Sequence, residues 1–112
     1  MVNDQGPRGD TGHDGSSGST PQSRVNTYGN GLGTGENISY GRKGAKAIVI
    51  QLLTDDGVLS RGHYNNIFDT KYKVCGVACG KHKFYKHMAV LNYCQSFTNE
   101  KGKSYTGVTG NR

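Results

Sequence analysis

The sequence lacks most of the features by which membrane, secreted and catalytic proteins are recognised. Only 32% of its 112 residues are hydrophobic, and no apolar run is long enough to cross a bilayer. The first residues, Met1 to Gly6, do not contain the apolar stretch of a signal peptide, which by itself predicts a chain that stays where it is made. A phosphate-binding loop and a Gly-x-Ser-x-Gly nucleophile motif are also absent, which removes two easily recognised classes of enzyme.

Cysteine is scarce, and its spacing does not define a framework. The three cysteines are Cys75, Cys79 and Cys94, and none of them forms a Cys-x-x-Cys pair. In a secreted protein an odd count predicts one disulfide and one free thiol, whereas in the cytosol the same residues would be small buried side chains. The sequence leaves both alternatives open.

Positive charge, by contrast, is in excess. The formal net charge is +6 and the isoelectric point is about 9.3. This excess favours solubility and attraction to acidic surfaces such as anionic lipid headgroups, but it does not by itself indicate nucleic acid. One hypothesis is therefore a basic module that binds anionic lipid or, less expectedly, nucleic acid. Its candidate residues are Lys81, Lys83, Lys86, Lys101 and Lys103.

The composition divides the chain into segments. Residues 1–44 are rich in glycine, and a glycine at every third position from Gly6 to Gly18 is interpreted as a loop. Residues 45–97 hold nearly all of the apolar residues, while residues 98–112 are polar and predicted to be mobile. We therefore predict one domain over residues 1–97, followed by a polar flexible tail over residues 98–112.

Apolar spacing predicts helices and a hairpin within that domain. Ala45, Ile48, Val49, Leu52 and Leu53 recur at helical intervals, which predicts a helix over residues 44–56 that stops at Gly57. A shorter helix is expected from Ser60 to Phe68 and a weaker one from Pro21 to Tyr28. Strands rich in Val, Tyr and Cys are expected over 72–79 and 87–97, joined by a loop over 80–86. The fold class is therefore α+β, ending in an antiparallel hairpin.

Four blocks of sequence occur in the order typical of one family. Gly35 to Gly41 reads Gly-Glu-Asn-Ile-Ser-Tyr-Gly, which resembles the Gly-Glu-Asn-Ile motif of the CAP superfamily. The segments 11–17, 55–68 and 73–80 are similar to other blocks of its microbial SCP-like members. That superfamily groups cysteine-rich secretory, antigen-5 and pathogenesis-related-1 proteins.

The resemblance implies an α-β-α sandwich with a large cleft. It places His13 and His63 as ligands of a divalent metal such as Zn²⁺, with Glu36 as the acidic neighbour. The sequence also departs from the pattern, since Ala47 stands where relatives carry a second glutamate. Ala89 stands where relatives carry a cysteine, so a hairpin disulfide to Cys79 is not available there; Cys94 is an alternative partner if it lies on the same strand face.

The resemblance also sets expectations for function. Members carry a long helix before the stretch that matches Met1, so we expect a domain truncated on its N-terminal side, whose uncovered sheet face stays exposed or is covered by another copy. The leading hypothesis is a non-enzymatic, extracellular-type binding module whose partners are a lipid or sterol or an extracellular protein. A weak metal-assisted hydrolase using His13, His63 and Glu36 is the enzymatic alternative. Asn37 begins a glycosylation sequon, and whether it is modified stays open.

Overall fold

The centre of the molecule is a three-stranded antiparallel sheet. It is seen in a computed structural model that describes residues 1–54 and 62–105. β4 (Lys86–Cys94) lies in the middle, between β2 (Gly35–Tyr40) and β3 (Val74–His82). Val90 on β4 pairs with Ile38 on one side and with Ala78 on the other, so these three side chains share one face. β3 is thus an edge strand among the described residues.

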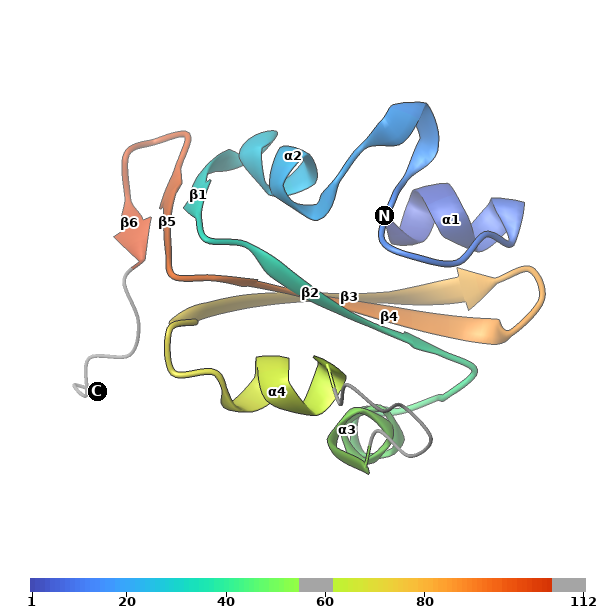
Figure 1. Ribbon diagram of the computed structural model, residues 1–112. Coiled ribbons are helices and arrows are strands. Elements are labelled where there is room, and N and C mark those ends of the chain that lie inside the picture. Colours follow the sequence, from blue (N-terminus) through green and yellow to red (C-terminus); the bar gives the residue numbers. More distant parts are fainter. Residues whose placement is uncertain (55–61, 106–112) are drawn as a thin grey trace.

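Helices lie on both faces of this sheet (Figure 1). One face carries α1 (Val2–Arg8), the 3-10 helix η1 (Ser16–Gly18) and α2 (Pro21–Asn26), and the other carries α3 (Ala45–Thr54) and α4 (Gly62–Phe68). Each face has its own apolar cluster: Val2, Ile38, Met88 and Val90 on the first, and Ile48, Leu52 and Ala89 on the second. The predicted α+β class is therefore confirmed.

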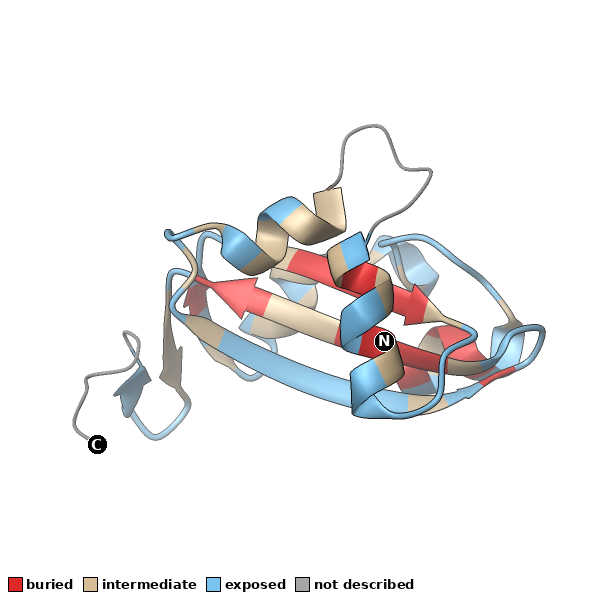
Figure 2. Cartoon of the chain, turned by 90° about the horizontal axis from the view of Figure 1, so that it is seen from below, coloured by how far each residue is buried: buried red, intermediate tan, exposed pale blue. Residues whose placement is uncertain are grey.

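Burial is uneven across the sheet. Figure 2 shows buried residues along β2 and β4, whereas β3 is exposed over most of its length. The exposed part includes Val77, whose residue surface is 64% accessible. The helices of both faces therefore cover β2 and β4 better than they cover β3.

A second, smaller sheet has the order β1-β5-β6. It consists of β1 (Gly29–Leu32), β5 (Ser96–Asn99) and β6 (Ser104–Tyr105). The single strand expected over residues 87–97 is wrong, because the chain leaves the central sheet at Gln95 and joins β1 instead. The boundary expected after residue 97 consequently falls inside β5, and backbone pairing with β1 places residues 98–99 in a strand.

The loop expected over residues 80–86 is shorter in the structure. β3 continues through His82 and β4 begins at Lys86. His82 is 4% exposed and builds the turn itself, since its Nδ1 accepts hydrogen bonds from the backbone N–H groups of Phe84 and Tyr85. The residue that looked like part of a basic loop is therefore the buried anchor of a tight turn.

The helix predictions over residues 44–56 and 60–68 are confirmed where the structure describes them, as α3 and α4. Residues 55 and 56 and the predicted cap Ser60 lie outside the described residues. The weaker helix is confirmed as α2, which begins with Pro21 and is capped by reciprocal hydrogen bonds between Thr20 and Ser23.

The glycine-rich first part of the chain is more regular than its composition predicts. The loop interpretation of residues 6–18 is wrong for residues 6–8, which belong to α1, and for residues 16–18, which form η1. Further along, residues 29–32 and 35–40 form β1 and β2. Gly6 is buried and lies against the carbonyl of Lys81, where a side chain would not fit. Glycine therefore serves here to bring a helix close to a strand, rather than to keep a loop flexible.

Candidate functional site

Glu36 is the centre of a buried polar cluster on the sheet face that carries α1 and α2. Its side chain is 1% exposed. The Nδ1 atom of His13 lies 2.9 Å from Oε1, and Arg24 Nη2 donates to Oε2 at 3.0 Å. A carboxylate removed from water needs such partners, because an unpaired buried charge is strongly unfavourable. The structure thus brings together two of the predicted site residues, His13 and Glu36, with a third that the sequence did not single out.

That third residue, Arg24, fastens the loop that carries His13. Arg24 lies on α2, and its Nη2 also donates to the His13 carbonyl at 2.8 Å, while Nη1 donates to the Ser19 carbonyl at 2.9 Å. Sequence reasoning missed Arg24 because its role depends on how α2 packs over β2. The available clue was chemical: a glutamate in a buried strand requires a cation nearby.

The geometry at His13 resembles one half of a metal site. A carboxylate that binds one imidazole nitrogen orients the ring, as it does for many metal-binding histidines, and leaves Nε2 free to coordinate. The His13 side chain is 54% exposed. Zinc centres, however, use several protein ligands together.

His63 does not complete that set in the described part of the chain. It lies at the start of α4, on the opposite face of the sheet, where its carbonyl accepts a hydrogen bond from Asn37 Nδ2 at 3.1 Å. Across residues 1–54 and 62–105, no three His, Cys, Asp or Glu side chains come close enough to hold a metal ion. The described residues therefore do not form a metal site, and zinc at His13 and His63 stays a prediction.

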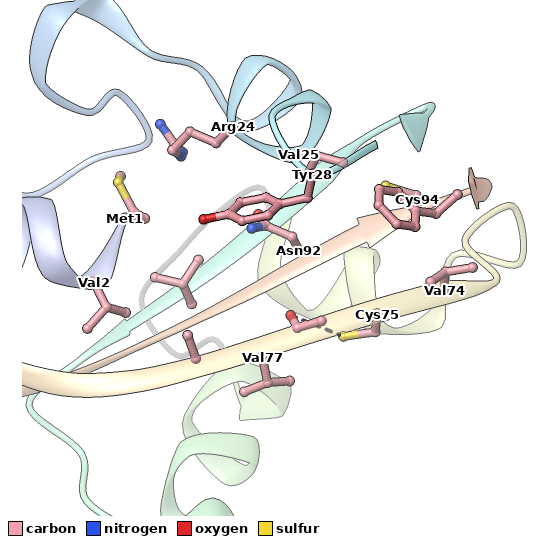
Figure 3. A pocket seen from close by; sticks show the side chains of 14 residues that line it. Met1, Val2, Arg24, Val25, Tyr28, Val74, Cys75, Val77, Asn92 and Cys94 are labelled. Carbon is pink, nitrogen blue, oxygen red and sulfur yellow. Dashed lines mark hydrogen bonds between the residues drawn. The ribbon is translucent and has the colours of Figure 1, made fainter. Parts of the chain in front are cut away.

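A groove lies beside the Glu36 cluster, on the same face of the sheet. α1 and α2 flank it and β3 forms its floor (Figure 3). Its volume is about 350 Å³, near the lower end of the 300–1,000 Å³ typical of ligand pockets. The walls are largely apolar and include Met1, Val2, Val25, Tyr28, Val90 and Phe97.

Small side chains keep the floor of this groove low. Gly76 and Ala78 both lie on the floor. A side chain built at Gly76 would meet no atom within 4 Å, so the space above it is open. The groove therefore exists because the edge strand presents glycine and alanine where a central strand would present a bulky residue.

Two buried polar atoms, both on residues that line the groove, have no hydrogen-bond partner among the described residues. They are Nε of Arg24, which is a hydrogen-bond donor, and Oδ1 of Asn92, which is an acceptor. Each unsatisfied buried polar atom costs on the order of 1–3 kcal/mol. Most buried polar atoms in native proteins have a hydrogen-bond partner, so these two are unusual.

The cysteines are all free thiols in this structure. Cys79 pairs with Ala89 across the hairpin, and Cys94 lies opposite Val74 with its side chain on the other face from Cys79. Cys94 is 5% exposed, whereas Cys75 and Cys79 are exposed. The register therefore does not permit Cys94 to replace the missing hairpin partner of Cys79.

The sequon at Asn37 is not accessible in the folded chain. Asn37 is fully buried, and its Nδ2 donates to Tyr93 Oη and to the His63 carbonyl. Its Oδ1 accepts from Asn66 Nδ2 at 3.0 Å. All of these contacts connect β2 to α4 and β4, so the asparagine has a structural role.

A helix-sheet-helix arrangement with a polar cluster and an apolar groove on one face defines the class: a small α+β domain. Comparison with known families agrees, since the cysteine-rich secretory protein family, CAP, matches residues 2–95. The chain belongs to the CAP family, whose members are generally non-catalytic binding modules and are commonly extracellular. No curated protein and no solved structure matches the chain. Within the described residues, the helices are too short or too polar to span a membrane.

Proposed function

We propose that this CAP domain is a non-enzymatic, extracellular binding module that holds a hydroxyl-bearing lipid, such as a sterol, in the groove between α1, α2 and β3. The observation that carries the proposal is a largely apolar groove whose lining also includes the polar side chains of Arg24 and Asn92. Apolar pockets with a few placed polar groups bind ligands whose body is apolar and whose orientation is fixed by those groups.

The two polar atoms favour a hydroxyl over an acid as the ligand headgroup. A hydroxyl both accepts and donates, so it is chemically matched to a donor such as Arg24 Nε and to an acceptor such as Asn92 Oδ1. A fatty-acid carboxylate only accepts, and it would leave Asn92 Oδ1 without a donor. The charge of Arg24 is also already neutralised by Glu36, 3.0 Å away, so little attraction remains for a second anion.

The enzymatic alternative is less well supported by the same cluster. A metal-assisted hydrolase would need Glu36 as a base, yet both of its carboxylate oxygens are engaged by Arg24 and one also by His13. The hydrogen-bonding capacity of the carboxylate is therefore taken up by side chains of the protein itself. We therefore assign Glu36 a structural role in the proposed module.

A direct binding assay tests the sterol proposal. A fluorescent sterol is titrated into the parent chain, into Ala78→Leu, which fills the groove floor, and into Ala45→Leu, which makes the same change on the opposite face. We expect saturable binding that Ala78→Leu weakens at least tenfold and Ala45→Leu leaves unchanged. A long-chain fatty acid is the competitor. Equal sterol affinity in all three proteins, or full displacement by the fatty acid, would contradict the proposal.

A second candidate function is contact with an anionic membrane through the β3–β4 turn. Lys81, Lys83 and Lys86 are exposed there beside Phe84 and Tyr85, which are 68% and 52% exposed. Lys101 and Lys103 lie at the β5–β6 turn, at the far end of the molecule (Figure 1), so the five lysines do not form one patch. Exposed aromatic rings between lysines suit the interface of a bilayer, where rings enter the headgroup region and charges meet anionic lipid.

Vesicle sedimentation tests this second candidate. Vesicles with and without phosphatidylserine are compared at low and high salt, using the parent chain and a Lys83→Gln/Lys86→Gln variant. We expect binding that requires phosphatidylserine, falls with salt and weakens in the variant. Substitution of Lys101 and Lys103 by glutamine is the matched control. Binding that needs those two residues instead would place the contact elsewhere.

A further inference from the structure

The outer edge of β3 is exposed, uncharged and unoccupied among the described residues. From Val74 to Gly80 the strand reads Val-Cys-Gly-Val-Ala-Cys-Gly, and residues 75–79 are all exposed. Natural proteins usually protect such an edge with a charge, a proline or a covering segment, because its free backbone groups can pair with another strand. Residues 75–79 contain neither a charge nor a proline, and none of the segments that the structure describes covers them.

The hydrogen-bond pattern shows which backbone groups face outward. The N–H of Gly41 donates to the carbonyl of His87, so His87 and alternate residues of β4 direct their backbone groups toward β2. The remaining residues of β4, among them Met88 and Val90, direct theirs toward Gly80 and Ala78 of β3. Cys75, Val77 and Cys79 must then present their N–H and C=O groups to the open edge.

α1 limits the length of this open edge. Gly6 lies against the Lys81 carbonyl, and its own carbonyl accepts a hydrogen bond from the Lys83 N–H at 2.8 Å. The edge is therefore covered from Lys81 onward and open over residues 75–79. Val77 is the middle residue of this segment.

We propose that residues 75–79 of β3 pair antiparallel with the same residues of a second copy of this chain, about a two-fold axis at Val77. Self-pairing of a strand by two-fold symmetry places each residue opposite the one equally far from the axis on the other side. Val77 then faces Val77 of the second copy, and Cys75 faces Cys79. The pairing is self-complementary: apolar side chains meet at the axis, and a cysteine meets a cysteine on either side.

The spacing of the two thiols is what singles out a second copy as the partner. Cys75 and Cys79 lie on the same face of one strand about 13 Å apart, so they cannot bond to each other. In the symmetric pair, opposite residues have Cα atoms about 5.5 Å apart, which lies within the range of disulfides. Cys94 is buried on the other face and takes no part.

The interface can be locked by oxidation with a small disulfide such as oxidised glutathione. The thiolate of Cys75 attacks one sulfur of glutathione disulfide and releases one reduced glutathione. The thiolate of Cys79 of the second copy then attacks the mixed disulfide, forms the Cys75–Cys79 bond and releases a second glutathione. Each bridge thus consumes one glutathione disulfide, and the symmetric dimer contains two bridges. Packing around the sulfur raises the pKa of the Cys75 thiol, so the exchange is run at mildly alkaline pH.

Mixing two single variants tests the pairing and its register together. In a pair of Cys75→Ser chains, each Cys79 lies opposite a serine of the other copy. In a pair of Cys79→Ser chains, each Cys75 likewise lies opposite a serine. We expect each variant alone to remain monomeric on non-reducing gels, and an equimolar mixture to give a cross-linked dimer. The parent should dimerise and keep one of its three thiols per chain free, that of Cys94. Cross-linked dimers of equal yield in either variant alone would overturn the proposal, as would no cross-linked dimer in the mixture.

A non-covalent variant separates pairing from chance collision of thiols. Val77→Lys places two like charges at the axis, and Val49→Lys makes the same change on the exposed side of α3. We expect Val77→Lys to slow disulfide dimerisation at least tenfold and Val49→Lys to leave its rate unchanged, with equal thermal midpoints for both monomers. Equal rates in both variants would show that the thiols meet without strand pairing. Sterol binding uses the groove face and is assayed separately, so failure of one proposal does not imply failure of the other.

Discussion

Two groups of buried polar atoms lie on the sheet face under α1 and α2, and they differ in whether they have hydrogen-bond partners. Glu36 has a partner on each oxygen, whereas Arg24 Nε and Asn92 Oδ1 have none among the described residues. Arg24 belongs to both groups, because its terminal nitrogens bind Glu36, His13 and Ser19 while its Nε has no partner among the described residues. The comparison teaches that the charged cluster is held together by its own ion pairs and hydrogen bonds, whereas the two unsatisfied atoms belong to residues that also line the groove.

The largest expected change in the free energy of unfolding comes from breaking the ion pair between Arg24 and Glu36. Arg24→Met leaves the Glu36 carboxylate buried with only His13 beside it, and removal of one partner of a buried ion pair costs about 3–5 kcal/mol. Urea denaturation of the variant should show this loss. The double variant Arg24→Met/Glu36→Gln removes both charges and should recover part of it. A single-variant loss below about 1 kcal/mol would mean that the pair is effectively solvated.

A smaller change in the free energy of unfolding, of opposite sign, is expected at Asn92, whose Oδ1 has no hydrogen-bond partner among the described residues. Asn92→Leu removes a buried acceptor that has no partner, so the free energy of unfolding should rise by about 1 kcal/mol while sterol affinity falls. Asn30→Leu, at an exposed position in β1, is the matched control and should change neither by much. Loss of stability in Asn92→Leu would indicate that Oδ1 is satisfied in solution.

On the opposite face of the sheet, the hydrogen-bonded pair of Asn37 and Tyr93 predicts that the stability of the fold decreases at alkaline pH. Burial raises the pKa of Tyr93 to about 12, with Cys75 contributing and the hydrogen bond from Asn37 opposing the shift. Because the unfolded phenol ionises near pH 10, stability from the neutral form is complete below pH 10 and is lost as the pH rises toward 12. Tyr93→Phe should flatten the decline of stability in that window, whereas Tyr105→Phe, at an exposed position, should not. Parallel declines in both variants would assign the transition to other groups, such as Tyr40 or Cys75.

The smallest expected effect is that of zinc. One oriented imidazole with a distant second histidine binds weakly, so zinc at the concentration of its dissociation constant would add only about 0.4 kcal/mol. We expect the thermal midpoint to rise slightly in the parent and not at all in His13→Ala. A large rise that is also lost in His63→Ala would show that both histidines bind one ion, as the family resemblance implies.

The part of the fold that sequence could predict is the part where one face is apolar. α3 follows from the helical spacing of Ile48 and Leu52, both of which are buried in the second core. β2 could not be found in this way. Glu36, Asn37 and Ser39 are polar and yet buried, so the strand has no alternation of apolar and polar residues.

Only some of the residues of the candidate site could be predicted from the sequence. His13 and Glu36 were reached through the family motifs, and the structure places His13 Nδ1 2.9 Å from Glu36 Oε1, while their role toward a metal stays a prediction. Arg24 and Asn92 carry no local pattern, because each becomes significant only when α2 and β4 close around the groove. Residues whose role depends on distant packing cannot be inferred from spacing along the chain.

The contact between α1 and the β3–β4 turn has a consequence for the order of folding. The Gly6 carbonyl binds the Lys83 N–H, and His82 Nε2 lies 2.7 Å from the Asp10 carbonyl, so residues 6–10 are joined to residues more than seventy positions later. Contacts that close such long loops are entropically expensive and form late. During synthesis, α1 emerges long before the turn that receives it. α1 is therefore expected to be among the last of the described elements to dock, because the residues that receive it are made more than seventy positions later.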